Sequence, residues 1–427
     1  MRLKDLGYLY SGLTGKAGED FAIEDPAQGK PFVPFTNIFN NFRVDVDNVR
    51  LVAMTKGEVQ NRVETGDILF LMSSEDYESI GKPSVVSDKV GELYLNSFCR
   101  GLRITRSEVC PDYVAYYLSA ESVRQFLRLE ARGFTRINLK IDRLASQEVL
   151  LPKLSVQRQI VAYLDEKAAA IDARVAVLEK KLSAYRRLKT SVINRAVTRG
   201  LDPKAEMKDS GVDWIGKIPA GWEARNLTQC CDFFKGLAIT KADLTESGTP
   251  VISYGQIHSK LNIGTHLRPE LLRHVPEAIA AADPGSRLKV GDIVFADTSE
   301  DVEGCGNCVL IDAEFPVYAG YHAIVARPDE SGRSRYLSYL FNAPRWRAQI
   351  RAKVAGIKVF SITQRIFKGV SLLLPSVADA NAIADYLDAE CAKIDKMAEL
   401  VTREIELYGK LKRSLINEVV TGKRKVA

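Results

Sequence analysis

The sequence has no long apolar run, because none of its apolar stretches approaches the roughly 18 residues that a membrane-spanning helix requires. Its opening segment, Met-Arg-Leu-Lys-Asp, lacks the apolar core of a secretory signal. We therefore expect a cytoplasmic chain without membrane contact. Cysteine is scarce, and the seven cysteines are odd in number and irregularly spaced, which is typical of a reducing compartment. We expect free thiols and no disulfides.

Motifs for several kinds of catalysis are missing as well. The sequence has no Gly-x4-Gly-Lys-Ser/Thr phosphate loop, and residues 12–16, Gly-Leu-Thr-Gly-Lys, have the wrong spacing for one. It also lacks a cofactor loop and the Asn-Pro-Pro-Tyr-like tetrapeptide with which a methyltransferase holds a flipped adenine. Cys305 and Cys308 have the spacing of a zinc pair, but no second pair follows and the four histidines form no ligand pattern, so a tight turn with two thiols is the preferred interpretation. We expect no catalytic residues, no cofactor and no metal.

Positive charge is mild overall but concentrated in one segment. The net charge is +6 and the isoelectric point is near 8.8, values that permit nucleic-acid binding without requiring it. Residues 153–200 contain eleven Lys or Arg and four Asp or Glu, whereas residues 376–427 contain nine of each. This excess is typical of a solvated helix face whose cations complement the helix dipole. A surface that faces phosphates or an acidic partner is the alternative.

An internal repeat organises the chain, and its best-matched segments recur at an offset of 223 residues. Three pairs of segments carry it: Ile160–Asp172 with Ile383–Asp395, Tyr185–Asn194 with Tyr408–Asn417, and Leu150–Pro152 with Leu373–Pro375. A duplicated sequence indicates a duplicated function on a quasi-symmetric frame.

The repeated segments have the heptad pattern of long helices that pair with each other. Both copies keep the same register, and both interrupt it with a lysine at the same place, Lys189 and Lys412. Prolines 152 and 375 precede the helices and glycines 200 and 422 follow them, so each helix is predicted to span about 40 residues, or about 60 Å. We expect an antiparallel coiled coil that forms a rigid rod; ordinary core helices of a bundle are the alternative. The predicted spacer positions are Leu164, Ile171, Leu178, Leu182, Tyr185, Val192, Leu387, Ile394, Val401, Ile405, Tyr408 and Leu415.

A segment of about 150 residues precedes each helix, and its Gly, aromatic and β-branched residues predict a mixed α/β domain. The two domains are related: residues 63–70 align with 288–295, and residues 113–127 and 336–350 each predict one amphipathic helix. Other stretches are interpreted as divergent. Residues 37–41 and 73–76 are expected to have no counterpart in 253–258 and 298–301, as would suit two domains that read different ligands.

The helix repeat, together with Met207–Pro219 and Gly221–Glu223, resembles the specificity subunits of Type I restriction-modification systems. In that family such a stretch links the central helix to the second recognition domain. The first domain resembles a recurrent type of recognition domain in three segments: Gly66–Phe70, Ser73–Glu75 and Leu95–Cys99. It departs from the pattern because it lacks the Trp-containing start of the second domain and begins directly with Gly12–Lys16.

The resemblance implies a non-catalytic subunit in which each recognition domain reads one half of a bipartite, asymmetric site in double-stranded DNA. The paired helices would hold the two domains apart and dock two adenine-N6 methyltransferase subunits, and restriction/translocase subunits would complete the complex. The implied domains are residues 1–151 and 226–374 for recognition, 152–200 and 375–427 for the conserved helices, and 201–225 for the linker.

Polar loop residues are the candidates for DNA contact, although Asn, Ser, Asp and Gly are turn residues first. Arg and Lys beside a glycine suit a phosphate, because a close backbone and a long cation both reach that oxygen. The predicted DNA-binding residues are Lys16, Asn37, Asn41, Ser73, Ser74, Arg132, Thr135, Arg136, Tyr254, Gln256, His258, Thr298, Ser299, Lys353 and Lys358.

Two other functions stay open from the sequence. One is an enzyme that both recognises DNA and modifies or cleaves it, which the missing cofactor motifs disfavour. The other is a coiled-coil scaffold unrelated to DNA, which would show no salt-dependent DNA affinity.

Overall fold

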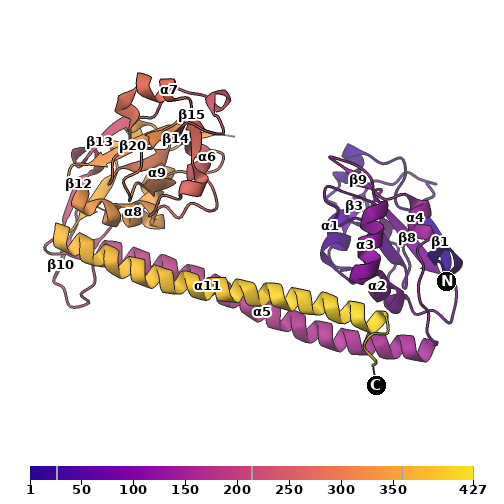
Figure 1. The fold of residues 1–427 in the computed structure, drawn as a ribbon. Coiled ribbons are helices and arrows are strands. Elements are labelled where there is room, and N and C mark those ends of the chain that lie inside the picture. Colours follow the sequence, from indigo (N-terminus) through magenta and orange to yellow (C-terminus); the bar gives the residue numbers. More distant parts are fainter. Residues whose placement is uncertain (26, 213–214, 357–358, 427) are drawn as a thin grey trace. The chain divides into compact units, whose positions relative to one another are not determined.

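A computed structural model describes residues 1–25, 27–212, 215–356 and 359–426 of the chain. It divides into two compact units. Unit 1 comprises Met1–Glu179 and Thr402–Ala427, and unit 2 comprises Lys180–Val401 (Figure 1). Two long helices, α5 (Leu154–Arg199) and α11 (Val377–Val420), each contribute one segment to each unit.

Unit 1 is built on an antiparallel four-stranded sheet in the order β1-β8-β4-β6. A second sheet has the order β3-β2-β7, and β5 pairs with β9. The strands are β1 (Gly7–Ser11), β2 (Lys30–Val33), β3 (Arg50–Val52), β4 (Ile68–Leu71), β5 (Ser73–Ser74), β6 (Pro83–Val85), β7 (Tyr94–Leu95), β8 (Cys99–Ile104) and β9 (Ile137–Asn138). The short helices are α1 (Phe35–Asn40), α2 (Pro111–Ser119), α3 (Glu121–Glu130) and α4 (Ile141–Ala145).

Unit 2 repeats this plan, with sheets β13-β20-β16-β18 and β15-β14-β19 and the pair β17-β21. Two further pairs, β10-β11 and β12-β22, complete the strands of unit 2; the second corresponds to a single antiparallel bridge between Arg2 and Glu148 in unit 1. The strands are β10 (Met207–Asp209), β11 (Lys217–Pro219), β12 (Glu223–Asn226), β13 (Cys231–Lys235), β14 (Thr249–Ile252), β15 (Arg273–Val275), β16 (Ile293–Ala296), β17 (Thr298–Ser299), β18 (Cys308–Leu310), β19 (Tyr318–Ala319), β20 (Ala323–Pro328), β21 (Phe360–Ser361) and β22 (Ser371–Leu374). The short helices are α6 (Tyr254–Ile257), α7 (Glu277–Ala282), α8 (Ser334–Asn342), α9 (Pro344–Arg351) and α10 (Gln364–Phe367).

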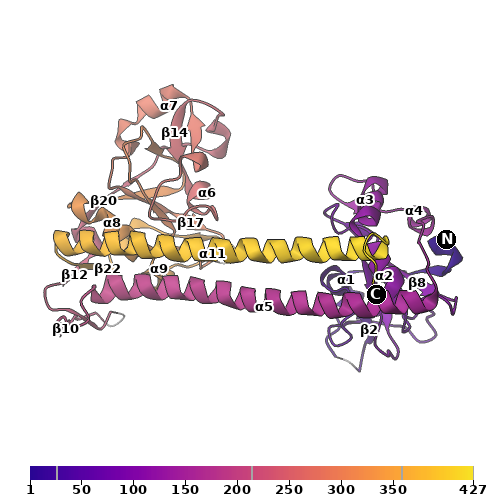
Figure 2. The same cartoon turned by 60° about the horizontal axis from the view of Figure 1, so that its bottom comes forward.

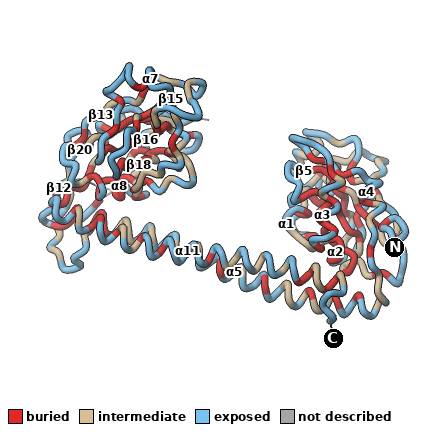
Figure 3. Tube along the Cα trace, viewed as in Figure 1, coloured by how far each residue is buried: buried red, intermediate tan, exposed pale blue. Residues whose placement is uncertain are grey.

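One of the two inner strands of each main sheet, β4 or β16, is buried on both faces, which explains its uninterrupted apolar sequence. Because side chains alternate along a strand, Ile68 and Phe70 of β4 enter one hydrophobic cluster and Leu69 and Leu71 enter another. Strand β16 divides its side chains between two clusters in the same way. Figure 3 shows this buried core within each unit. The mixed α/β fold expected from the sequence is confirmed for both units.

Each predicted amphipathic helix is in fact two helices, so this detail of the prediction is wrong. In unit 2 the break falls at Ala343, whose extended backbone precedes Pro344, the first residue of α9. Proline disfavours a helical conformation in the residue before it, which accounts for the break. Unit 1 has the same break at Ala120, between α2 and α3, without a proline.

The two long helices are confirmed, with 46 residues in α5 and 44 in α11. Both end where the sequence predicts, because Gly200 and Gly422 have the positive φ angles, 71° and 75°, that close a helix. At the start of α11, the Ser376 hydroxyl accepts a hydrogen bond from the backbone N–H of Asp379.

Within each unit, a segment of α5 packs antiparallel to a segment of α11 (Figure 2). In unit 1 the start of α5 meets the end of α11, and Lys412 forms an ion pair with Asp172 at 2.6 Å. In unit 2 the end of α5 meets the start of α11, and Lys189 pairs with Asp395 at 2.6 Å. These four residues are related by the 223-residue offset, so the two lysines that interrupt the heptads have the same role in both units.

An equivalent hydrogen bond joins each globular part to a long helix. The Tyr116 hydroxyl donates to Asp165 at 2.6 Å in unit 1, and the Tyr339 hydroxyl donates to Asp388 at 2.6 Å in unit 2. Both tyrosines are largely buried, and desolvation, followed by the neighbouring carboxylate, raises their pKa.

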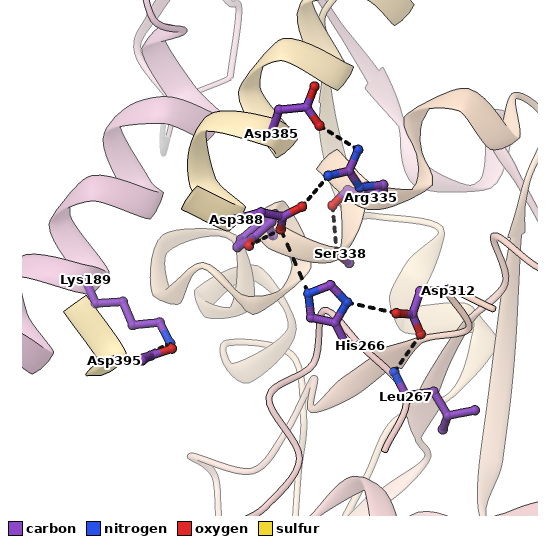
Figure 4. A network of polar contacts seen from close by, with 10 residues as sticks. Lys189, His266, Leu267, Asp312, Arg335, Ser338, Asp385, Asp388 and Asp395 are labelled. Carbon is purple, nitrogen blue, oxygen red and sulfur yellow. Dashed lines mark hydrogen bonds and ion pairs between the residues drawn. The ribbon is translucent and has the colours of Figure 1, made fainter. Parts of the chain in front are cut away.

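The cations around this joint differ between the units. In unit 1, Arg43 bridges Asp112 and Asp165. In unit 2, Arg335 contacts Asp385 and Asp388, as Figure 4 shows. His266 lies between Asp388 and Asp312 and hydrogen-bonds to Asp312 at 2.8 Å (Figure 4). The shared hydrogen bond thus positions both domains, while the surrounding charges have diverged.

Among the described residues, no helix is long and apolar enough to cross a membrane.

Candidate nucleic-acid interface

One polar loop follows the main sheet in each unit at an equivalent place. Loop 1 (residues 73–82) begins with β5, and loop 2 (residues 298–307) begins with β17. They read Ser-Ser-Glu-Asp-Tyr-Glu-Ser-Ile-Gly-Lys and Thr-Ser-Glu-Asp-Val-Glu-Gly-Cys-Gly-Asn. The interpretation that residues 73–76 have no counterpart in 298–301 is therefore wrong. Their offset is 225 residues rather than the 223 of the helices, because the copies differ in length between these segments.

Both loops form the same turn. The backbone N–H of Ser79 donates to the Asp76 carboxylate at 2.7 Å in loop 1, and that of Gly304 donates to Asp301 at 2.6 Å in loop 2. Each loop then passes through a glycine with positive φ, 68° at Gly81 and 86° at Gly306. The shared residues thus set a shared backbone conformation.

An arginine behind each loop holds it in place, buried in unit 1 and partly buried in unit 2. Arg124 of α3 is 6% exposed and donates to the carbonyl oxygen of Glu78 at 2.7 Å. Arg347 of α9, its equivalent at the 223-residue offset, donates to the carbonyl oxygens of Glu303 at 2.9 Å and Cys305 at 3.2 Å. Desolvation lowers the pKa of Arg124 to about 10 and also lowers that of Arg347. Two otherwise divergent domains have kept the same cation in an unfavourable environment, which indicates that loop position matters in both.

In unit 2, loop 2 borders a pocket of about 750 Å³. Its lining is Tyr254, Gly255, His258, Thr298, Ser299, Glu300, Asp301, Glu303, Gly304, Asn307, His322 and Val359. The Asn307 amide nitrogen donates to Nδ1 of His258 at 2.9 Å, so Nε2 carries the proton and donates to the Thr298 carbonyl at 2.8 Å. Five of the predicted DNA-binding residues of unit 2 precede β18 in the sequence. Four of these five line the pocket: Tyr254, His258, Thr298 and Ser299.

His322 is the most unusual residue of this pocket. Its φ of 55° is the only positive value at a non-glycine residue in the described part of the chain. Its Nδ1 lies 3.0 Å from a carboxylate oxygen of Asp297, and its ring is 5.4 Å from the ring of Tyr254. A half-exposed side chain held in a strained backbone conformation is typical of a functional position.

In unit 1, the equivalent region presents an arginine and an aromatic ring. Arg136 donates to the Ser73 hydroxyl at 2.9 Å, and its guanidinium carbon lies 4.2 Å from the ring centre of Phe98. Phe98 is 46% exposed, and Phe134, in the same segment as Arg136, is 97% exposed. Both rings are open to a partner. Phe98 and His322 are equivalent because each immediately precedes the matching strand, β8 or β20.

Two predicted residues are engaged inside unit 1 and so do not present their polar atoms to a ligand. Lys16 forms an ion pair with Glu58 at 2.7 Å. Asn37 is fully buried, and its amide nitrogen donates to the carbonyl oxygens of Asp45 and Asn48, both at 2.8 Å. Turn chemistry explains Asn37 better than recognition does.

The other predicted residues are spread over both units. Asn41 donates to the Asn37 side chain, and Ser74 is buried at the base of loop 1. Arg132 and Thr135 are exposed beside Arg136, and Gln256 accepts a hydrogen bond from the backbone of Ser253. Lys353 donates to the carbonyl oxygen of Gly369, and Lys358 lies outside the described residues.

The described residues contain no group of three or more His, Cys, Asp or Glu placed to hold a metal ion. Cys305 and Cys308 are buried free thiols, and burial raises the pKa of the Cys308 thiol to about 12. Cys305, in loop 2, and Cys308, in β18, belong to the same hydrophobic cluster of unit 2.

Comparison with known proteins gives consistent matches. Residues 2–179 match the family model of the Type I restriction modification DNA specificity domain. The chain is 24% identical to the putative Type I restriction enzyme MjaX specificity subunit of Methanocaldococcus jannaschii, over 99% of this chain and 93% of that protein. It is 22% identical to the Type I restriction enzyme MjaVIII specificity subunit of the same organism, over 88% of this chain and 83% of that protein.

A solved structure from work on the complex assembly and conformational transition of the Type I restriction-modification system has a similar fold. It superposes with a TM-score of 0.68 at 14% identity, over 98% of this chain and 96% of the other.

Proposed function

The chain belongs to the specificity subunits of Type I restriction-modification systems, and on that premise we propose that each unit reads one half of a bipartite DNA site. The observation that carries this proposal is the duplicated loop. Two copies of one fold support one loop conformation, with different side chains around it. That arrangement suits two readers of different base sequences on a common frame.

Residues that are alike in the two units cannot distinguish two different half-sites. We therefore propose that the residues that differ between the units recognise the bases. Beside loops 1 and 2, the main differences are Phe98 against His322, Arg136 against Val359, and Lys82 against Asn307. We assign discrimination between bases to these pairs and loop placement to the shared residues.

The chemistry of these side chains fits the edges of base pairs in the major groove. An arginine suits the O6 and N7 acceptors of guanine, and an exposed aromatic ring suits the methyl group of thymine. Arg136 and Phe98 offer this pair in unit 1. In unit 2, Nε2 of His322 and the second amide N–H of Asn307 can form hydrogen bonds with a base, beside Thr298 at the start of loop 2. The other polar atoms of these two side chains have partners within unit 2. Arg132, Lys353 and Lys358 remain proposed phosphate contacts.

We further propose that the paired helices set the interval between the half-sites, because α5 and α11 each contribute to both units. In keeping with the solved relative, which comes from work on an assembled Type I system, we propose that the chain docks methyltransferase and restriction subunits. The relatives are named specificity subunits, which agrees with the expectation that catalysis resides in other subunits.

The proposal is tested by mapping methylated adenines in cells that contain this chain and its methyltransferase subunit. The variants Arg136→Ala and His322→Ala are compared, with Lys56→Ala, an exposed lysine away from loop 1, as the control. We expect Arg136→Ala to relax the motif in one half-site and His322→Ala to relax it in the other. Relaxation of both halves by either variant would contradict the assignment. Methyl transfer by the purified chain alone would instead support the alternative of a self-sufficient enzyme.

A further inference from the structure

A groove in unit 2, distinct from the pocket beside loop 2, runs along the last four turns of α5. It has a volume of about 620 Å³, and Arg345 at the start of α9 closes one side. The lining is Ser183, Arg186, Arg187, Thr190, Ser191, Asn194, Arg195, Thr198, Arg199 and Arg345.

The charge of this groove is positive, because none of its described lining residues is acidic. Residues 180–201 contain seven Lys or Arg and no Asp or Glu. Lys189 pairs with Asp395, but none of the five arginines of the groove forms an ion pair with any described residue. All five are exposed. Other arginines of unit 2 do form ion pairs, for example Arg327 with Asp292 at 2.7 Å.

The groove is not duplicated in unit 1, although its helix is. At the 223-residue offset, Arg195 corresponds to Glu418, Arg199 to Gly422, and Arg345 to Ser122. Ser122 and Asn417 hydrogen-bond to each other in unit 1, whereas the side-chain oxygen of Asn194, the equivalent of Asn417, is buried and has no hydrogen-bond partner among the described residues. The positive groove is therefore a property of one half of the molecule and not a requirement of the coiled coil.

The residue types that line the groove indicate which kind of ligand it can bind. None of the ten lining residues is apolar, whereas the core of a protein–protein interface is apolar and poor in charge. Arginine with Ser, Thr and Asn is the set that contacts phosphate oxygens in protein–DNA interfaces, which are polar and strongly positive. From Arg187 to Arg199 the helix rises about 18 Å, the axial length of about five nucleotides of one strand.

We propose that this groove binds the backbone phosphates of duplex DNA, and that it supplies unit 2 with a sequence-independent contact that unit 1 lacks. The inference rests on the proposed function, because it assumes that the chain binds duplex DNA. The positive groove would then increase the affinity for DNA without contributing to base recognition.

The test compares the double variant Arg195→Gln/Arg199→Gln with the control Lys410→Gln/Arg413→Gln. The control removes the same charge from the corresponding end of α11. Binding of the chain with its methyltransferase subunit to duplex DNA is measured over a range of salt concentrations. Two lost phosphate contacts are expected to reduce the slope of log affinity against log salt by about 1.8, which is roughly 10- to 60-fold in affinity near 0.1 M salt. The methylated motif should not change, and Arg195→Lys/Arg199→Lys should retain most of the slope.

Thermal melting shows whether each variant is folded, and Arg345→Gln, which alters only the side of the groove, provides a second probe. An unchanged slope in folded variants would overturn the proposal. So would normal DNA binding with loss of the methyltransferase subunit, because the groove would then be a protein-docking face. A wild-type complex that binds DNA without preferring its methylated motif would refute the proposed function. The salt dependence of the groove variants would still show whether the groove binds phosphates.

Discussion

The arginines behind the two loops, Arg124 and Arg347, give the most specific prediction of the structure. Replacing Arg347 by Met keeps a long side chain and removes the cation, so the carbonyl oxygen of Cys305 loses its donor and that of Glu303 keeps only Arg351. A buried acceptor left without a partner costs about 1–3 kcal/mol, while the desolvation cost of the charge is relieved at the same time. We therefore expect little change in the stability of the whole chain and a looser loop 2.

A loss of about 1.4–3 kcal/mol in loop placement corresponds to roughly 10- to 150-fold weaker binding at one half-site. The corresponding variant in unit 1, Arg124→Met, removes one donor to a loop carbonyl instead of several, so its effect should be smaller and should fall on the other half-site. Each variant is the control for the other, because both replace the same residue type at equivalent positions.

The assay is competition binding with duplexes in which one half-site or the other is scrambled. Scrambling the half-site assigned to unit 2 should reduce the affinity of Arg347→Met much less than it reduces the affinity of the wild-type chain. Affinity for unrelated DNA should be unchanged, since a general structural fault would lower that as well. Equal losses at both half-sites, or equal losses for specific and unrelated DNA, would refute the reasoning.

Three further outcomes are expected. One extra helical turn of four residues, inserted at facing points midway along both α5 and α11, should lengthen the coil by about 6 Å and widen the gap of the methylated motif by one or two base pairs; methylome sequencing would contradict this by showing altered half-sites with the old gap. Reversing the charge of Lys189 with Lys189→Glu should lower the free energy of unfolding by about 0.2–1 kcal/mol, the usual contribution of an exposed ion pair. Adding Asp395→Lys should restore the lost stability. A double-mutant cycle by urea unfolding that shows no coupling between the two positions would refute the pairing. Tyr116→Phe and Tyr339→Phe each remove a hydrogen bond to a carboxylate, and each should cost about 1.5–3 kcal/mol, visible as a lower melting temperature; unchanged melting would show that the joint does not stabilise the domains.

The long helices were predictable because their signals are local and periodic. The heptads, the flanking prolines and the closing Gly200 and Gly422 fixed type and limits without tertiary information. The role of Lys189 was not predictable from one helix, because its partner Asp395 lies 206 residues away. Only the antiparallel packing shows why the same break in the heptads recurs.

The candidate site was predictable in part. The sequence predicts four polar loop residues that do surround one pocket: Tyr254, His258, Thr298 and Ser299. It predicts Asn37 on the same grounds, but Asn37 is a buried turn residue, because sequence alone does not separate a turn amide from a ligand amide. The bracing arginines were missed, although Arg124 and Arg347 recur at the repeat offset. That recurrence is the signal from which they could have been found. The loops that they contact recur at an offset of 225 residues instead of 223, so a search at the offset of the helices does not align the loops.

The central claim is that each unit reads one half-site independently of the other. It is tested most directly by exchanging residues 1–150 for the corresponding domain of another specificity subunit with a similar first domain, and by sequencing the methylome of cells that contain the chimera. The present account predicts that one half of the methylated motif changes while the other half and the gap are retained. A motif altered in both halves would contradict it.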